Sequence, residues 1–183
     1  MRNRDPTNGA LVSATLDTVV RLPYDNGMAI VLNPEEQQGT AMDSAEMDRL
    51  IHDHITSEIA GDVTGAVSVY TDDVVHDVVG FPTGPMLGKA AAAGFYDYLN
   101  ANFSTETMTA IRSYYGDDFC VVEHDTTGTV PGEFLGVPGN GKRVNFRMLH
   151  IWEFRDGLVS RENIWLDGGS IVHQLTAPPA AAD

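Results

Sequence analysis

The sequence predicts a single α+β domain in which helices come first and an antiparallel sheet follows. Two observations lead to this prediction. Apolar residues with helical spacing occur in the first half of the domain, and long β-rich segments fill the second half. The chain has 183 residues, of which 43% are hydrophobic and 20% charged. That length and composition suit one globular core and leave too few residues for a second.

We expect three parts along the chain. Residues 1–43 form an extension in which two β-rich runs flank an Asn-Gly pair, which is a signal for a hairpin turn. A flexible arm, or an arm that reaches a partner subunit, is the alternative. Residues 44–175 form the domain itself, and residues 176–183 form a frayed tail.

The first helix of the domain is predicted to begin at Asp43 or Ser44, either of which can cap it. Helical spacing places seven residues on one face: Met47, Leu50, Ile51, His54, Ile55, Glu58 and Ile59. His54 and Glu58 are polar residues on the stripe that should face the core. We therefore expect both to contribute to a binding site.

The remaining elements follow from propensity and alternation. The predicted helices are 63–70, 89–103 and a short one over 168–175, and residues 81–88 form a loop. The predicted strands are 74–79, about 107–115, 119–130, 143–154 and 159–167.

The turn at Asp156-Gly157 gives a register for the last two strands. If these two residues form a tight hairpin loop, Phe154 lies opposite Val159, and the remaining pairs follow from there. The residues that this register places on one face are Phe146, Met148, His150, Trp152, Arg161, Asn163, Trp165 and Asp167. The face is largely apolar on the first strand, so we expect it to point inward. Alternation within 119–130 places His124 inward too, whereas the side of the sheet on which His76 lies is left open.

This cluster suggests acid/base chemistry in an apolar pocket. An imidazole with an ordinary pKa of about 6.5 is easily tuned across neutral pH, so His150 is the candidate acid/base group, with His124 beside it. Asp167 would orient His150 or act as the base, and Asn163 would donate to a developing enolate oxygen. The expected substrate contacts are His54, Glu58, His76, Phe146, Met148, Trp152, Trp165 and Arg161, the last near the rim. A core histidine bonded to a backbone carbonyl is the alternative for His150.

Composition and motifs exclude several classes of function. The formal charge of −15, from 26 acidic and 11 basic residues, argues against nucleic-acid and membrane-surface partners. The lone Cys120 lies in an apolar run, which favours a buried thiol in a reducing compartment over a nucleophile, and we expect a cytoplasmic protein. No metal-ligand motif or phosphate-binding glycine loop occurs, so no metal and no cofactor are expected. A zinc site built from His54, His124 and His150 is the minority alternative.

The segment 127–167 resembles the SnoaL-like polyketide cyclases of the nuclear-transport-factor-2-like superfamily. The residues that carry the resemblance are Thr127-Gly128-Thr129, the run 132–138 (GEFLGVP), Gly141-Lys142-Arg143-Val144, Phe146-Arg147, Phe154-Arg155-Asp156-Gly157 and Trp165-Leu166-Asp167. The order of elements from about 44 to 175 fits as well.

The resemblance implies a curved sheet wrapped by the N-terminal helices into a cone around a pocket, with no cofactor and a homodimeric assembly. Cyclases of this group close rings by aldol chemistry with an acid/base Asp on the strand before Phe-Arg-Asp-Gly. His150 stands at that position here, and Val130 replaces the group's His after Thr-Gly-Thr. The expected function is aldol-type cyclisation or isomerisation of a small hydrophobic carbonyl compound. A hydratase, dehydratase or epoxide hydrolase, or a binding module without catalysis, is the alternative.

Overall fold

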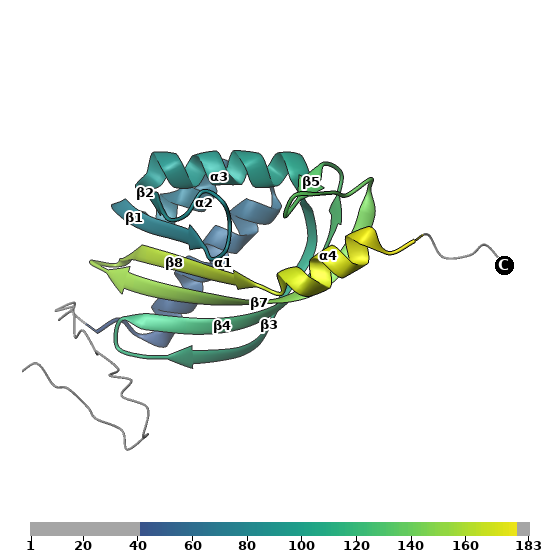
Figure 1. Ribbon diagram of the computed structural model, residues 1–183. Coiled ribbons are helices and arrows are strands. Elements are labelled where there is room, and N and C mark those ends of the chain that lie inside the picture. The colour runs from purple at the N-terminus through teal and green to yellow at the C-terminus, as the bar shows by residue number, and fades with distance from the viewer. Residues whose placement is uncertain (1–40, 179–183) are drawn as a thin grey trace, which may run out of the picture. The chain divides into compact units, whose positions relative to one another are not determined.

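A computed structural model describes residues 41–178 of the chain (Figure 1). The helical elements are α1 (Ser44–Ile59), α2 (Val63–Ala66), the 3₁₀ turn η1 (Val67–Val69), α3 (Lys89–Asn102) and α4 (Gly168–Thr176). The strands are β1 (Tyr70–Val78), β2 (Met86–Leu87), β3 (Ser104–Tyr115), β4 (Phe119–Val130), β5 (Glu133–Phe134), β6 (Val137–Pro138), β7 (Lys142–Arg155) and β8 (Leu158–Leu166). The hairpin predicted within residues 1–43 lies outside the described residues.

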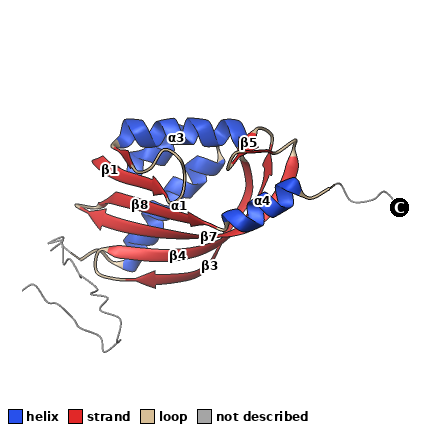
Figure 2. Cartoon of the chain, in the orientation of Figure 1, coloured by secondary structure: helices blue, strands red, loops and turns tan. Residues whose placement is uncertain are grey.

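Six strands form one curved sheet in the order β2-β1-β8-β7-β4-β3. Figure 2 shows α1 behind the sheet, α3 running above it next to β1, and α4 in front near β7. The predicted α+β class with helices first is therefore confirmed. One pairing differs from a purely antiparallel sheet, because β1 lies parallel to β8. This pairing brings the first strand of the domain against the last one.

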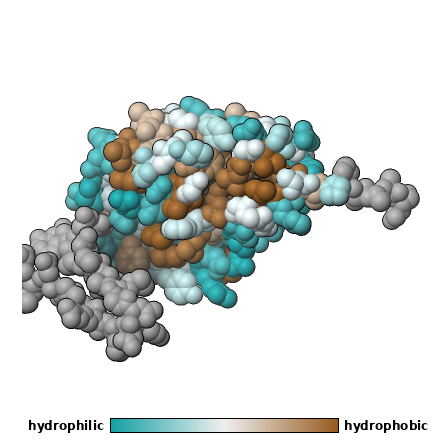
Figure 3. Space-filling model, viewed as in Figure 1, coloured by the Kyte–Doolittle hydropathy of each residue, from teal (hydrophilic) through white to brown (hydrophobic). Residues whose placement is uncertain are grey.

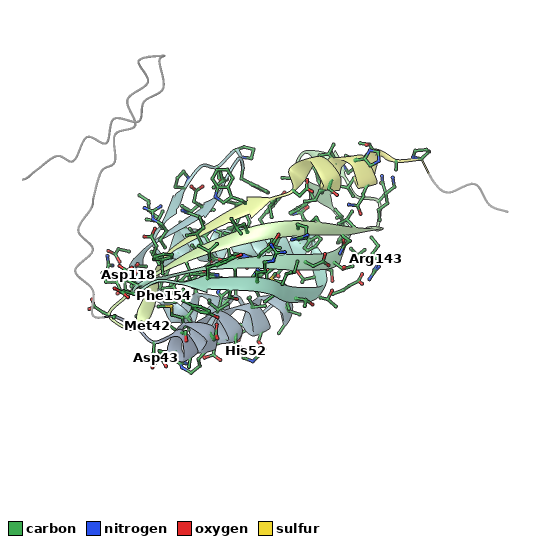
Figure 4. All side chains as sticks on the ribbon, turned by 90° about the horizontal axis from the view of Figure 1, so that it is seen from below. Met42, Asp43, His52, Asp118, Arg143 and Phe154 are labelled. Atoms are coloured by element: carbon green, nitrogen blue, oxygen red, sulfur yellow. The ribbon has the colours of Figure 1, made fainter. Side chains whose placement is uncertain are left out.

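Helix α1 forms where the spacing of apolar residues predicted it. The Asp43 side chain accepts a hydrogen bond from the backbone N–H of Glu46 at 2.9 Å, which satisfies one of the free donors at the helix start. Four residues of the predicted stripe are buried, Met47, Leu50, Ile51 and His54, whereas Ile59 at its end is 42% exposed. Figure 4 shows His52 on the outer side of this helix, away from the sheet.

One end of the sheet is fixed by backbone hydrogen bonds. The N–H of Met42 donates to the carbonyl of Asp117 at 2.8 Å, and the N–H of Phe154 donates to the carbonyl of Asp118 at 2.7 Å. Figure 4 shows Met42, Asp118 and Phe154 together at one end of the sheet, with Arg143 at the other. The hydrogen bonds tie the entry to α1, the β3–β4 turn and the end of β7 together.

The β7–β8 hairpin contains a bulge that the sequence register did not include. Asp156 and Gly157 have φ values of 54° and 77°, as a two-residue hairpin loop requires, and Phe154 pairs with Val159 as predicted. The register then shifts between Glu153 and Phe154, because Ser160 is an extra residue on β8. Beyond the bulge every predicted pair is wrong by one residue. Each side chain in this part of β8 therefore points to the face opposite to the one predicted for it.

Three further expectations need correction. The predicted helix 63–70 ends at Ala66, and Tyr70 already begins β1, which is longer than the predicted strand 74–79. Residues 131–142, which lie between the predicted strands 119–130 and 143–154 and were assigned no element, contain the small β5–β6 hairpin. Within residues 41–178, no helix is long and apolar enough to cross a membrane.

Candidate active site

The inner face of the sheet, together with α1 and α3, encloses an apolar pocket with a polar end. It holds about 460 Å³ of space between side chains, the open mouth included. Its apolar lining consists of Val78, Phe95, Leu99, Phe103, Met108, Phe134, Phe146, Met148, Ile164 and Leu166. Its polar lining consists of Glu58, His76, Tyr96, Thr105, His150 and Glu162. The charge-bearing groups thus meet in a largely water-excluding environment.

Glu162 is the central polar residue of this end. It lies on β8 opposite Trp152 and is 1% exposed. The Tyr70 hydroxyl donates a hydrogen bond to its Oε2, and the Tyr96 hydroxyl lies 3.2 Å from the same oxygen. Burial raises the pKa of the Glu162 carboxyl above its ordinary value, although the charge of His54 and the bond from Tyr70 act in the opposite direction. A carboxyl with a raised pKa is suited to accept and return a proton near neutral pH.

The hydroxyl of Tyr96 connects the polar groups. It lies 2.7 Å from the Tyr70 hydroxyl, 3.0 Å from Nε2 of His76 and 3.1 Å from Nε2 of His54. Burial, followed by the charge of Glu162, raises the pKa of both phenols well above their ordinary value. Both tyrosines are therefore neutral donors that hold the carboxylate in place.

His54 is the positive group of the cluster. Its Nδ1–H donates to the carbonyl of Ala66 at 2.8 Å, and its Nε2 lies 3.5 Å from Glu58 and 3.9 Å from Glu162. Complete burial lowers the pKa of His54, but the two carboxylates and the carbonyl outweigh burial, and the net pKa lies above the ordinary value. An imidazolium at this position balances one of the two buried carboxylates.

The other three inner histidines are neutral. Burial lowers the pKa of His76 to about 3, with a further contribution from the charge of His54, and burial lowers the pKa of His124 to about 4. Burial, followed by the charges of the other histidines, lowers the pKa of His150 well below its ordinary value. Neutral imidazoles offer one donor and one acceptor each.

The position of Glu162 favours one tautomer of His150. Nε2 of His150 lies 3.5 Å from Oε1 of Glu162, and its Nδ1 lies 3.0 Å from Nδ1 of His124. A proton on Nε2 of His150 faces the carboxylate favourably, and Nδ1 then accepts the proton of His124. His150 thereby presents a neutral N–H donor to the pocket, next to the carboxylate.

The structure brings most of the predicted site residues together and separates four of them. His54, Glu58, His76, His124, Phe146, Met148, His150 and Trp152 lie in or against the pocket. The predicted inward positions of Arg161, Asn163, Trp165 and Asp167 are wrong, because the bulge turns this part of β8 over. Trp165 is 53% exposed, and the Asp167 side chain caps α4 by accepting from the N–H of Ser170 at 3.0 Å.

Sequence reasoning missed Glu162, Tyr70 and Tyr96. Tyr96 follows Ala92 and Phe95 at helical spacing, so the stripe on α3 contained a signal for it. Tyr70 was assigned to a helix that ends before it. Glu162 could not have been found without the bulge, since alternation from the turn puts it on the outer face.

Within the described range 41–178, no group of three or more His, Cys, Asp or Glu side chains is arranged to hold a metal ion. The zinc alternative with His54, His124 and His150 therefore has no geometric support. His124 and His150 face one another through hydrogen-bonding nitrogens, while Nδ1 of His54 is bonded to the Ala66 carbonyl.

In a comparison with protein families, the family described as "SnoaL-like domain" matches residues 40–162. No curated protein matches the sequence.

Solved structures share the fold at low sequence identity. A putative SnoaL-like polyketide cyclase from Jannaschia sp. CCS1 has 19% identity and a TM-score of 0.66, covering 77% of this chain and 100% of its own. A putative isomerase from Rhodopseudomonas palustris has 15% identity and a TM-score of 0.61, covering 73% and 97%. An epoxide hydrolase of the LEH-like type from M. tuberculosis has 17% identity and a TM-score of 0.57, covering 72% and 90%. These similarities establish the fold and leave the reaction open.

Proposed function

Because the chain belongs to the family of SnoaL-like domains, we propose that it is an acid/base enzyme, of the lyase or isomerase type, that uses only its own side chains. Its substrate is a small hydrophobic carbonyl compound of polyketide, terpenoid or steroid-like size, and the reaction is aldol-type cyclisation or double-bond isomerisation. The observation that supports this most directly is the buried Glu162 carboxylate beside a neutral His150 at the polar end of an apolar pocket.

In the proposed mechanism Glu162 is the general base. It removes a proton from the carbon next to the substrate carbonyl, and the electron pair moves onto the carbonyl oxygen to give an enolate. The raised pKa of the Glu162 carboxyl lowers the free-energy difference between the carboxylate and a weak carbon acid. Tyr70, held against Oε2, keeps the carboxylate oriented so that Oε1 faces the pocket beside His150.

His150 stabilises the enolate oxygen in this mechanism. A neutral N–H donor that is already oriented gains more from charge developing on the substrate oxygen than from the ground-state carbonyl. The depressed pKa of His150 keeps the ring in this neutral form at working pH. In cyclisation the enolate carbon attacks a second carbonyl, and the alkoxide that forms takes the proton from Glu162. In isomerisation the enolate takes the proton back from Glu162 at another carbon, and the carbonyl re-forms.

A second candidate is the addition of water to an epoxide or a double bond. It is favoured by the fold similarity to the epoxide hydrolase from M. tuberculosis and by the same carboxylate, which can deprotonate a water molecule instead of a carbon acid. A binding module without catalysis is the remaining alternative.

The proposal includes a homodimer located in the cytoplasm. The outer face of the sheet supports a dimer, since Trp165 is 53% exposed there and Leu149 and Ile151 are only half-buried. Figure 3 shows hydrophobic side chains gathered on this face, with hydrophilic ones around them.

Proton exchange at carbon tests the proposed chemistry before the natural substrate is known. The purified chain is incubated in D₂O with a panel of neutral bicyclic ketones, 2-tetralone among them, and α-deuteration is followed by proton NMR. We expect catalysed exchange that falls by about 10²–10⁴-fold in Glu162→Gln, the range typical of a general base. Glu106→Gln, at an exposed carboxylate paired with Arg143, is the matched control. Binding of the ketones without exchange would favour the binding module, and exchange that survives in Glu162→Gln would refute the role of Glu162.

A further inference from the structure

The pocket continues outward into a second, polar chamber. This outer chamber holds about 610 Å³ with its open mouth included, and its polar lining comes from Glu58, Asn100, Ser104 and Thr105. Four residues line both the outer chamber and the inner pocket: Glu58, Leu99, Phe103 and Thr105. A ligand that fills the apolar pocket can therefore extend one end into the outer chamber.

Charge in the outer chamber is negative. Glu58 lies where the two chambers meet, and its side chain is only 10% exposed. None of the described residues that line either chamber is Lys or Arg. The positive His54 is completely buried behind Glu58 and does not line the chambers. A carboxylate or phosphate on the ligand would therefore meet Glu58 and Glu162 with no cation to receive it.

The backbone adds to this field. Helix α1 ends at Ile59 and helix α3 ends at Asn102, so the C-terminal ends of both helices border the outer chamber. The end of a helix where carbonyl groups are unpaired carries partial negative charge and favours cations. Neither helix has a basic residue in its last turn to neutralise this charge. The net charge of −15 on the whole chain also attracts cations and repels anions.

We propose that the outer chamber binds a protonated amine of the ligand at Glu58, so that the substrate is a lipophilic carbonyl compound that also carries an amine, rather than an acid or a phosphorylated compound. The apolar body of such a ligand occupies the inner pocket, and the ammonium group donates to Glu58, with Asn100, Ser104 and Thr105 as further acceptors. This inference deepens the proposed function and rests on the pocket being the ligand site. It does not depend on which acid/base reaction takes place there.

Three matched ligands test the charge preference: 2-naphthylmethylamine, 2-naphthylmethanol and 2-naphthoate. Their binding to the full chain is measured by isothermal titration calorimetry at pH 7. We expect the amine to bind at least about tenfold more tightly than the alcohol, and the carboxylate to bind most weakly. Tighter or equal binding of the alcohol or the carboxylate, or no binding of the amine up to millimolar concentration, would overturn the proposal.

Two carboxamide variants locate the amine. In Glu58→Gln we expect amine affinity to fall about tenfold, to that of the alcohol, while alcohol affinity stays within twofold. Glu133→Gln is the matched control, because Glu133 borders a separate surface hollow next to Phe81 and Tyr98. Loss of amine binding in Glu133→Gln instead of Glu58→Gln would contradict the assignment. Circular dichroism melting curves of both variants verify that they are folded.

The two proposals can fail separately. If the amine preference is absent while proton exchange still depends on Glu162, only the charge assignment is wrong. If Glu58 determines amine binding but no exchange occurs, the charge assignment stands and the acid/base chemistry is wrong.

Discussion

Acidification should destabilise the protein through its buried neutral histidines. His76, His124 and His150 are each less than 5% exposed and have folded-state pKa values below the ordinary one, owing to burial. The unfolded chain binds a proton at each of these positions below about pH 6.5, whereas the folded chain does not. The stability that depends on these three histidines being neutral is therefore fully present above about pH 6.5. It is lost progressively as the pH falls towards their folded-state pKa values.

The magnitude follows from the two pKa values of about 3 and 4 for His76 and His124. A pH of 5 lies roughly 1.5 units below the pKa of a histidine in the unfolded chain. At that pH each of the two histidines has therefore lowered the unfolding free energy by about 2 kcal/mol. The two together amount to about 4 kcal/mol, which is a large share of the stability of a typical domain. His150 adds to the loss.

Two groups act in the opposite sense. His54 has a raised pKa, so the stability it contributes is complete below about pH 6.5 and is lost as the pH rises through its folded-state value. Glu162 also has a raised pKa, so as the pH falls the folded chain binds a proton at Glu162 before the unfolded chain does. This proton uptake stabilises the folded state and makes the net loss of stability in acid smaller. We therefore expect maximal stability near neutral pH.

Urea unfolding at pH 5 and pH 7 measures the contribution of one histidine. In His76→Gln the difference in unfolding free energy between the two pH values should be about 2 kcal/mol smaller than in the wild-type chain. His52→Gln is the control, because His52 is exposed to water in the folded state as well. An unchanged pH difference in His76→Gln, or a stability maximum below pH 5 in the wild-type chain, would refute the reasoning.

Three further predictions concern single positions. Tyr96→Phe removes the hydroxyl that four buried polar groups share, and should lower the unfolding free energy by about 2–4 kcal/mol, whereas Tyr114→Phe at a 60% exposed ring should have little effect. Trp165→Glu on the outer face should shift sedimentation from dimer to monomer, and a wild-type chain that sediments as a monomer would contradict the proposed assembly. Gly128→Ala should destabilise by more than about 2 kcal/mol, because its Cβ would overlap a buried phenylalanine ring. Gly94→Ala, in a helix with nothing within 4 Å of the new Cβ, should instead stabilise by up to about 1 kcal/mol, and melting curves distinguish the two.

Local periodicity was sufficient to predict the residues of single elements. Helical spacing placed His54 on the buried face of α1, and two-residue alternation placed Met148, His150 and Trp152 on one face of β7. Alternation also placed His124 inward on β4. These positions depend only on the geometry of one helix or one strand, which the sequence determines through its apolar pattern.

The centre of the candidate site depends on contacts between elements. The bulge at Ser160 reverses the faces of β8. As a result Glu162 lies in the pocket, where the predicted register had placed Asn163. A bulge adds one residue without changing the composition of the strand, so alternation counted from the turn cannot detect it. The parallel pairing of β1 with β8 then brings Tyr70 and His76 to the same carboxylate.

By itself, the sequence determined the α+β class, the order of the long helices and strands, and the inward placement of His54, His124 and His150. Only the tertiary structure decided that the group at the polar end is a carboxylate with a raised pKa and that the histidines beside it carry different charges. The physical reason is that a face within one strand follows from local stereochemistry. Register between strands, and the pKa values that burial and neighbouring charges set, arise only when distant segments pack together.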